Sequence, residues 1–495
     1  MSKTIKTLAT LLPETASVFN DVELSGVCSD SRHVQSGDLF IALSGSDFNG
    51  VDFIDQAIDS GAAAVLVESS ARWRRHDIYR NTPVVVLEGL QEKASEVARV
   101  YYAYDCDQLT AVGITGTNAK TSCSAYIQQL LSSMGHRCGV IGTLGWGVGE
   151  QLVYTGNTTP SNVLMHRIMH QFVEQGVRYA AVEVSSHGLE LGRVSNVGFQ
   201  IALFTNISRD HLDFHGTMQA YIDAKKKLFM MQSVECAVIN VDDECAQEFI
   251  AAVAPDVRVL SYGFSESADV RVMNFRSSLD GMKADVAYVG EIYSIGSELI
   301  GDFNIYNLVA SFAVMLCMEF KPHDIAKNVC HIRPVQGRMQ RIENDLSLTV
   351  LVDFAHTPDG LNNVLKTLKE KASGQVWCVF GCGGDRDKGK RELMGCAADS
   401  YADRVILTSD NPRSEDPQVI VDEIAQACFG EHVQQILDRK EAINYALAHA
   451  EAGDCVLIAG KGHEDYQEVL NEKTFFSDEQ VARDALAQLS NGDAK

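Results

Sequence analysis

One segment of the chain has the residue types and the spacing that bind a phosphate chain. Residues 113–121 read GITGTNAKT, so Gly113 and Gly116 precede the pair Lys120 and Thr121. In such a loop the backbone N–H groups hold the phosphates, the lysine counters the β/γ charge and the threonine hydroxyl reaches Mg²⁺. The segment therefore predicts a site for a nucleoside triphosphate. The alternative is an ordinary strand-to-helix turn with a surface lysine.

Ala119 stands where such loops usually carry their last glycine. A side chain there costs about 1–2 kcal/mol if the position requires a positive φ, whereas alanine is tolerated or even favoured if the position is helical. Because Ala119 directly precedes Lys120 at the expected start of a helix, we expect helical backbone geometry at this residue. We therefore expect nucleotide binding to persist.

The elements that must hold this loop are visible in the pattern on either side of it. Residues 110–115 are apolar and β-branched, which predicts a strand. After the loop, Tyr126, Leu130 and Met134 recur at helical spacing, and Gly135 suits a helix C-terminus. The loop thus joins a strand to a helix, as a phosphate site requires.

Alternating strand and helix patterns continue along the chain and predict an α/β fold with three domains. At 495 residues the chain is too long for a single core. We expect boundaries near Asp107 and near Arg333, where the strand-loop-helix rhythm restarts. The predicted domains are an N-terminal domain (1–107), a central P-loop ATPase domain with a parallel sheet (108–333) and a Rossmann-like C-terminal domain (334–495). Ligands are expected at the carboxyl ends of the strands.

The composition limits the partners. Lys and Arg number 42 and Asp and Glu 66, which gives a net charge of −24. Such a field repels nucleic acid and anionic lipid, so we expect neither as a partner. Thirteen cysteines without a CxxC pair predict reduced thiols, with neither disulfides nor a zinc site. We find no apolar run long enough for a signal or a membrane span, and we expect a cytoplasmic protein.

The phosphate loop and a series of further motifs resemble the Mur ligases, ATP-dependent enzymes that extend the peptide of the cell-wall precursor UDP-N-acetylmuramic acid. The loop is similar to the family's T-G-T-N-G-K-T. The other motifs follow in the family's order along nearly the whole chain: NTTP, EVSSHGL, FTNISRDHLDFHG, GDFNIYN, PVQGRM, DFAHTPDGL, GCGGDRDKGKR, DNPR and GKGHEDYQ. Within the family the chain most resembles the MurE type, which adds the third amino acid to UDP-N-acetylmuramoyl-L-alanyl-D-glutamate.

The resemblance implies the residues that bind ATP and magnesium. By themselves Glu183 and His211, each after an apolar strand, could be structural residues. Lys225 matches a lysine that the family modifies to a carbamate, and Asn304 could also cap a helix. The implied catalytic residues are Lys120, Lys225, Glu183 and His211, and the implied metal ligands are Thr121, Glu183, His211 and carbamylated Lys225. The implied ATP contacts are Gly113, Thr115, Gly116, Thr117, Asn118, Ala119, Lys120, Thr121, Asn304, Asn307, Arg338, Asp353 and His356.

The resemblance also implies a pocket for the UDP-linked sugar and its peptide. Its residues are Ser31, Arg32, Ser46, Asp47, Phe48, Asn157, Thr158, Thr159, Ser185 and Arg193. Residues 46–48 depart from the His-Gln-Ala of enterobacterial relatives. Leu191 stands where some relatives have a glutamine, so one polar contact is expected to be lost.

The incoming amino acid is expected to bind in the C-terminal domain. As a bare string, SDNPRSEDP predicts a polar turn, but in MurE-type enzymes D-N-P-R marks those that add meso-diaminopimelate. Arg413 could clamp the distal carboxylate, which lysine lacks, and Glu464 could meet the distal ammonium. The implied diaminopimelate residues are Arg386, Asp410, Asn411, Pro412, Arg413, Gly460 and Glu464.

The implied reaction is ATP-dependent peptide-bond formation through an acyl phosphate, in peptidoglycan precursor synthesis, by an enzyme that we expect to be monomeric. Two other ligases are alternatives, the lysine-adding relative and folylpolyglutamate synthetase. Arg413 disfavours the first, and the muramate-type N-terminal domain disfavours the second. Ala119 and Leu191 motivate a third alternative, a homologue that binds the nucleotide or the precursor without catalysis.

Overall fold

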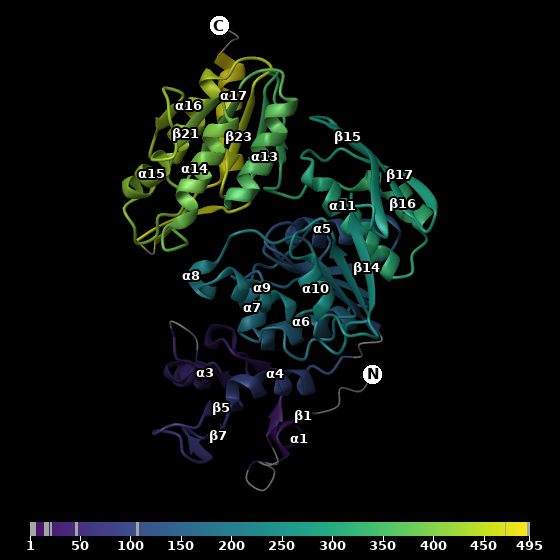
Figure 1. The fold of residues 1–495 in the computed structure, drawn as a ribbon. Helices are drawn as coiled ribbons and strands as arrows, with labels where there is room; N and C mark the ends of the chain where they lie inside the picture. Colours follow the sequence, from purple (N-terminus) through teal and green to yellow (C-terminus); the bar gives the residue numbers. More distant parts are fainter. Residues whose placement is uncertain are drawn as a thin grey trace. The chain divides into compact units, whose positions relative to one another are not determined.

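The computed structural model describes residues 6–13, 19, 22–44, 48–104, 108–470 and 472–492. By their contacts they form two compact units. The first holds the described residues up to Gly113 together with His136–Gln200 and Met231–Val234, and the second holds Ile114–Gly135, Ile201–Met230 and the chain from Glu235 onward. Both units mix helices and strands (Figure 1), which confirms the predicted α/β class. The boundaries at 107 and 333 stay a prediction. Within the described residues, no helix combines the length and the apolar character needed to cross a membrane.

The first unit begins with a small sheet whose strand order is β3-β4-β5-β7-β6. The first four strands run parallel, and β6 pairs antiparallel with β7. The bounds are β3 Gly26–Cys28, β4 Asp38–Ala42, β5 Ala64–Glu68, β6 Asp77–Tyr79 and β7 Thr82–Leu87, with α3 Ile54–Asp59 and α4 Leu90–Tyr101. Apolar residues on the two sides of the strands enter two separate cores, one of them closed by α4.

The same unit contains a second group of elements, whose strand β11 ends at Glu183. Strand β11 runs parallel to β9, and β10 pairs antiparallel with β9. The bounds are β9 Cys138–Gly142, β10 Gly145–Val148, α6 Asn162–Glu174, β11 Tyr179–Glu183 and α7 Ser186–Glu190. Because all five residues of β11 except Tyr179 are buried, the strand ends with a carboxylate in the protein interior.

The phosphate-loop region confirms the predicted strand and helix. Strand β8 spans Thr110–Thr115 and helix α5 spans Lys120–Ser133. In the second unit β12, β13, β14 and β15 pair in parallel, and β15, β16 and β17 continue as an antiparallel meander. The bounds are β12 Ile201–Phe204, β13 Cys236–Asn240, β14 Arg258–Gly263, β15 Val270–Ser278, β16 Gly281–Tyr288 and β17 Glu291–Ser297, with α8 Leu212–His215, α9 Met218–Lys226, α10 Ala246–Ala252, α11 Phe303–Cys317 and α12 Pro322–Asn328.

Ala119 does not have the helical geometry that we expected. It lies directly before α5 with φ 74° and ψ −6°, in the left-handed region. The chain has to turn sharply from the loop into the helix, and the left-handed conformation makes that turn. Because the Cβ of an L-residue crowds its own carbonyl in this region, the conformation costs about 1–2 kcal/mol.

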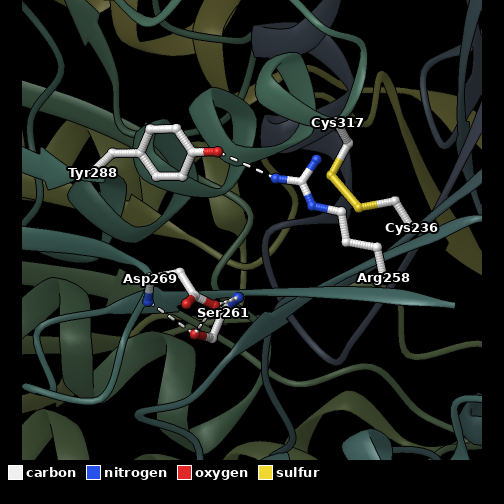
Figure 2. Close-up of a disulfide and its surroundings, with 6 residues drawn as sticks. All are labelled: Cys236, Arg258, Ser261, Asp269, Tyr288 and Cys317. Carbon is white, nitrogen blue, oxygen red and sulfur yellow. Dashed lines mark hydrogen bonds between the residues drawn. A yellow bond between two sulfur atoms is a disulfide. The ribbon is translucent and has the colours of Figure 1, made fainter. Parts of the chain in front are cut away.

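One pair of cysteines is bonded, contrary to the expectation that all thiols are reduced. Cys236, at the start of β13, forms a disulfide with Cys317, at the end of α11, with the two Cα atoms 6.4 Å apart (Figure 2). Helix α11 packs on β13, so packing brings together two residues that are 81 positions apart in the sequence. Near the bridge, Arg258 Nη2 donates to the Tyr288 hydroxyl at 3.2 Å. The order of cysteines along the chain carries no signal of this pairing.

The C-terminal part of the second unit is a doubly wound sheet with the strand order β18-β19-β23-β20-β21-β22. All its strands are parallel except β18, as in the predicted Rossmann-like arrangement. The strand bounds are β18 Gln340–Ile342, β19 Thr349–Asp353, β20 Val376–Phe380, β21 Arg404–Leu407, β22 Val433–Gln435 and β23 Cys455–Ala459. Helices α13 Pro358–Lys371, α14 Gly389–Tyr401 and α15 Pro417–Ala425 share one core, and α16 Arg439–His449 and α17 Asp478–Gly492 share the other (Figure 1).

Ion pairs of two buried arginines anchor this sheet. Arg439 at the start of α16 and Asp478 at the start of α17 form a bidentate pair at 2.7 Å with both side chains fully buried, and Arg439 Nη2 also donates to the Ala459 carbonyl at 2.8 Å. On α14, the buried Arg391 donates to Glu415 at 2.8 Å and to Glu423 at 2.7 Å. The first pair thereby fixes the end of β23, where an amino-acid pocket is expected.

Replacement of Ala119 by glycine should stabilise the protein. Relief of the left-handed strain, about 1–2 kcal/mol, exceeds the backbone entropy that glycine adds, about 0.5–1 kcal/mol. We expect Ala119→Gly to raise the apparent melting temperature and to leave nucleotide turnover unchanged or higher. The matched control is Ala125→Gly inside α5, which should lower the melting temperature. A destabilised Ala119→Gly variant would contradict the strain argument.

The Arg391–Glu415 pair should make stability depend on pH. The hydrogen bond from Arg391 lowers the pKa of Glu415 from 4.5 to about 2, so the pair stabilises the fold fully above pH 4.5 and loses this contribution as the pH falls toward 2. We expect Glu415→Gln to be about 1–3 kcal/mol less stable than the wild type at pH 7. The difference should shrink in urea titrations between pH 4.5 and 3. Glu431→Gln, at an exposed position in the turn before β22, is the control.

Candidate active site

The phosphate loop is held in shape by its own unit. Gly116 has φ 152°, and a Cβ there would overlap the Thr205 hydroxyl and lie 3.0 Å from the Asn206 nitrogen. The Thr117 hydroxyl lies 3.0 Å from the Tyr221 hydroxyl and accepts from the Ser208 nitrogen at 2.9 Å. The loop backbone therefore lies against the residues that follow β12, which leaves no room for a side chain at position 116. This close packing is a constraint that the sequence GITGTNAKT by itself only suggests.

Lys120 folds back over the loop. Its Nζ donates to the carbonyl oxygens of Gly116 and Thr117 at 2.8 and 2.9 Å. The first turn of α5 points its N–H groups at the same loop. Positive charge and backbone donors thus converge where the sequence places the phosphates, as anion binding requires.

Lys225 reaches the same carbonyl from α9. Its Nζ donates to the Gly116 oxygen at 2.8 Å and lies 4.5 Å from the centre of the Tyr221 ring, and the side chain is buried. Burial, together with the charge of Lys120, lowers the pKa of Lys225 well below its usual value despite the attraction of Asp210. The resemblance to the family selected this lysine from the run KKK, and burial separates it physically from Lys226, which pairs with Asp223 at the surface.

A carboxylate that we did not predict lies beside His211. Asp210 Oδ2 is 3.4 Å from His211 Nε2 and 3.7 Å from His356 Nε2, and the Asp210 side chain is buried. Burial by itself would raise the pKa of Asp210, but the close approach of His356 and the charges of His211 and Lys390 hold it far below its ordinary range. Two of the predicted residues, His211 and His356, are therefore brought together by a third. The signal was present in the motif SRDHLD, where the aspartate adjoins the histidine.

Other predicted ATP residues also come together in the second unit. Arg338 Nη2 donates to the Thr121 hydroxyl at 3.2 Å, and its guanidinium lies 4.4 Å above the Phe354 ring. Asp353, at the end of β19, accepts from the Met339 nitrogen at 2.6 Å and from the Ala355 nitrogen at 2.7 Å. Asp353 thus fixes the two segments that carry Arg338 and His356.

The two asparagines of GDFNIYN form one hydrogen-bonded cluster. Asn304 Oδ1 accepts from Asn307 Nδ2 at 2.9 Å and from the Tyr126 hydroxyl at 3.1 Å, and Asn304 Nδ2 donates to the Ile300 carbonyl at 2.7 Å. The expectation that Asn304 caps the helix is wrong, because α11 begins at Phe303 and Asp302 is its N-cap residue. Both asparagines are buried and tie the start of α11 to α5.

In the first unit, Glu183 meets residues that we had assigned to the sugar-peptide pocket. Its carboxylate accepts from the Thr143 nitrogen and hydroxyl, each at 3.0 Å, and the Thr143 hydroxyl lies 3.0 Å from that of Thr158. A Cβ at Gly142 would overlap this carboxylate. Thr143 was not singled out in the sequence, although it follows β9 directly.

The residues after β11 continue this cluster. The Thr159 hydroxyl donates to the Glu183 carbonyl at 2.9 Å and accepts from the Ser185 nitrogen at 3.0 Å, and Arg193 Nη1 donates to the Thr159 carbonyl at 3.0 Å. Leu191 ends α7 with 44% of its surface exposed. The predicted contacts Thr158, Thr159, Ser185 and Arg193 therefore surround Glu183 in one place.

The predicted uridine-diphosphate residues lie at the end of β3 in the same unit. The buried Ser31 donates to Gln56 Oε1 at 2.8 Å, and Arg32 pairs with Asp30 at 2.7 Å. Phe48 is 71% exposed and packs edge-on against Phe53. Asn157 is exposed, and its carbonyl accepts from Thr155. The predicted residues Ser46 and Asp47 lie outside the described part of the chain.

The predicted amino-acid pocket lies at the carboxyl ends of β21 and β23. Asn411 Nδ2 donates to Glu464 Oε2 at 2.8 Å, and both residues also contact the buried Lys461. Gly460 has φ 113°, and a Cβ there would lie 2.6 Å from Asp410 Oδ2. Asp410, Asn411, Gly460 and Glu464 are thus neighbours, as expected. Lys461 is an addition that the sequence did not reveal.

Arg413 is held at the rim of this pocket. Its backbone has φ 51° and forms a parallel β-bridge with Val469. Its side-chain Nη1 donates to the Gly384 carbonyl at 2.7 Å, and its Nε lies 3.5 Å from Glu468 Oε2. Pro412 is buried, and Arg386 is exposed, with its Nη1 on the Asp385 carbonyl. The guanidinium is therefore positioned by backbone and side-chain contacts before any ligand arrives.

The donor set suits a nucleotide and magnesium. The cradle at Gly116, the ammonium of Lys120 and the start of α5 match a polyphosphate, and the Thr121 hydroxyl and the Glu183 carboxylate are the oxygen ligands that Mg²⁺ prefers. Among the described residues there is no group of three or more His, Cys, Asp or Glu side chains placed to hold a metal by themselves. Any magnesium would therefore depend on hydroxyl and phosphate oxygens as well.

Known proteins that resemble this chain identify its family. Three family models match the chain: the Mur ligase family, catalytic domain (residues 23–102), the Mur ligase middle domain (114–315) and the Mur ligase, glutamate ligase domain (337–462). The UDP-N-acetylmuramoyl-L-alanyl-D-glutamate--2,6-diaminopimelate ligase of Chromobacterium violaceum is 42% identical over 92% of this chain and 93% of its own length. The enzyme of the same name from Bacillus cereus is 38% identical over 95% and 96%. A solved structure with this name aligns with a TM-score of 0.69 at 36% identity and covers 98% of this chain and 100% of its own. The chain belongs to the Mur ligase family.

Proposed function

We propose that this chain is an ATP-dependent peptide synthase that joins meso-diaminopimelate to UDP-N-acetylmuramoyl-L-alanyl-D-glutamate during peptidoglycan precursor synthesis. The observation that carries the proposal is the cluster of Asn411, Arg413 and Glu464 at the ends of β21 and β23. It occurs in a chain that is 42% identical to a ligase named for this reaction. The substrates are small molecules, and we propose a monomer that acts in the cytoplasm.

The phosphate loop is proposed to bind ATP. Backbone N–H groups of the loop and of α5 hold the β- and γ-phosphates, and Lys120 leaves the two carbonyls that it now contacts to neutralise the γ-phosphate. Arg338, which already touches the Thr121 hydroxyl, adds a second positive charge to the phosphate site. Asn304 and Asn307 are proposed to lie near the adenine.

Magnesium is proposed to be held by Thr121, Glu183, His211 and carbamylated Lys225, the last three of which are buried or half-buried. When bound, the ion neutralises the phosphate charge and polarises the transferred phosphoryl group. Thr143 orients the Glu183 carboxylate through two hydrogen bonds, and Asp210 holds His211. These contacts fix both side chains before the ligand arrives.

The reaction is proposed to proceed in two steps. A carboxylate oxygen of the D-glutamyl residue attacks the γ-phosphorus, the bond to the β,γ-bridging oxygen breaks, and ADP leaves. The amine nitrogen of diaminopimelate then attacks the acyl carbon, inorganic phosphate leaves with the C–O bond pair, and the nitrogen loses a proton to solvent. Lys120 and Arg338 stabilise the charge that develops on the transferred group.

Selection of the amino acid is proposed to rest on opposite charges at its distal end. The Arg413 guanidinium matches the distal carboxylate of diaminopimelate, and the Glu464 carboxylate matches its ammonium. With lysine in the pocket, Arg413 would keep only Glu468 as a counter-charge and would lack the ligand carboxylate, which is costly for a half-buried guanidinium. In the first unit, Ser31, Arg32, Thr158, Thr159, Ser185 and Arg193 are proposed to hold the UDP-sugar and its peptide.

One observation favours a second candidate function. Ala119 has a strained left-handed conformation in the phosphate loop. A loop that is no longer selected for catalysis could retain such strain. A homologue that binds the nucleotide or the precursor without turnover would release no phosphate with either amino acid. Phosphate release from ATP, Mg²⁺ and the UDP-muramoyl dipeptide, measured with meso-diaminopimelate and with lysine, separates the candidates. Release with lysine alone would refute the diaminopimelate assignment.

Removal of the guanidinium should weaken the choice between the two amino acids. We expect Arg413→Ala to lower kcat/KM for meso-diaminopimelate by about 30-fold or more, since a desolvated charge pair contributes about 2–5 kcal/mol. The kcat/KM for lysine should stay constant or rise, as measured by phosphate release. Arg404→Ala changes an exposed arginine elsewhere on the sheet and should have no effect. Equal losses for both amino acids would assign Arg413 a structural role.

Modification of Lys225 can be observed directly. Burial lowers the pKa of Lys225 and so favours the neutral amine, which is the form that attacks carbon dioxide. Protein equilibrated with ¹³C-bicarbonate should therefore show a carbamate carbon resonance in NMR. The resonance should be absent from Lys225→Met and present in Lys226→Met, whose lysine lies at the surface. A spectrum without this signal in the wild type would leave Lys225 as an unmodified donor to the loop.

A further inference from the structure

A buried lysine lies behind the proposed amino-acid pocket, and the reaction described above does not use it. The Lys461 side chain is fully buried, between Gly460 and Gly462, whose φ values of 113° and 56° are both positive. The loop after β23 turns tightly there and directs the side chain inward. A buried ammonium is costly unless charges and hydrogen bonds compensate it, so the fold retains this one against a penalty.

The partners of Lys461 are the two pocket residues themselves. Its Nζ donates to Asn411 Oδ1 at 3.0 Å and to Glu464 Oε2 at 3.1 Å, and it lies 5.4 Å from the centre of the Tyr466 ring. Asn411 Nδ2 donates to the same Glu464 oxygen at 2.8 Å. Within the described part of the chain, Glu464 Oε1 takes no hydrogen bond. The Glu464 side chain is 20% exposed, and of its two oxygens Lys461 and Asn411 hold Oε2.

The same network reaches Arg413. Asn411 Oδ1 also accepts from the Glu468 nitrogen at 3.0 Å, while the Glu468 carboxylate lies 3.5 Å from Arg413 Nε. Lys461 and Glu468 therefore both fix the orientation of the Asn411 amide, with its nitrogen toward Glu464. One set of contacts thus orders the groups that face the ammonium and the carboxylate of the ligand.

We infer that Lys461 is a positioning residue that sets which oxygen of Glu464 receives the distal ammonium of the incoming amino acid. By holding Oε2, Lys461 and Asn411 leave Oε1 as the acceptor for a primary ammonium. Lys461 also neutralises Glu464 in part, so that a pocket with a bound ligand keeps a balanced charge. The inference rests on the proposed function, because it takes diaminopimelate as the ligand.

A double-mutant cycle tests the inference. We expect Lys461→Met to raise KM for meso-diaminopimelate by about tenfold or more, because it removes a hydrogen bond to the charged Glu464. The value of kcat should change much less. Glu464→Gln should have a similar effect. Because Lys461 acts through Glu464, the double variant should be no worse than the poorer single variant. The KM values for ATP and for the UDP-muramoyl dipeptide should not change.

Lys473→Met is the matched control, since Lys473 is exposed and lies 4.0 Å from the same Tyr466 ring. Its KM values should equal those of the wild type.

Multiplicative effects in the double variant would overturn the inference. If Lys461→Met does not fold, Lys461→Gln carries the same cycle. A structure of the wild type with meso-diaminopimelate is an independent test: an ammonium on Oε1 supports the inference, and an ammonium on Oε2 contradicts it. A wild type that ignores meso-diaminopimelate would refute the proposed function itself.

Discussion

The carbonyl oxygen of Gly116 is the point on which the phosphate loop depends. Lys120 from α5 and Lys225 from α9 both donate to it at 2.8 Å, and a side chain at this residue would overlap Thr205. Burial and, as the smaller cause, the nearby charge of Lys120 lower the pKa of Lys225. The close approach of the loop to the residues after β12 therefore shapes the anion site and encloses its second lysine.

Contacts between neighbouring loops likewise order the proposed pocket of the C-terminal lobe. Each loop there follows a parallel strand, and the polar side chains of neighbouring loops bind one another: Asn411 after β21 meets Glu464 after β23. Two glycines leave room for these loops: a Cβ at Gly381 would overlap the Thr408 carbonyl, and a Cβ at Gly460 would lie 2.6 Å from Asp410 Oδ2. Pre-ordered polar groups lose little entropy on binding, which is how a small pocket discriminates between similar amines.

The spacing of apolar residues and the sequence motifs predicted the large features of this molecule. The strand at 110–115, the helix from Lys120 and the doubly wound C-terminal sheet follow from the alternation of apolar residues with turn residues. The motif series, through its resemblance to a family, selected residues that the structure brings together, as with Thr159, Ser185 and Arg193 around the end of β11. Features that depend on packing between distant segments were not predictable. The left-handed turn at Ala119, the Cys236–Cys317 bond and the role of Asp210 between two histidines all arise from tertiary contacts. Lys461 escaped notice because a lysine between two glycines is normally exposed, and only the fold shows it buried.

The ion pair between Arg439 and Asp478 has a practical consequence for anyone who shortens the chain. Asp478 is the first residue of the last helix, and its carboxylate is the counter-charge of a guanidinium enclosed in the interior. A chain cut before α17 would leave the buried Arg439 guanidinium without its counter-charge, so the final helix is an integral part of this lobe, although it carries no residue of the proposed pocket.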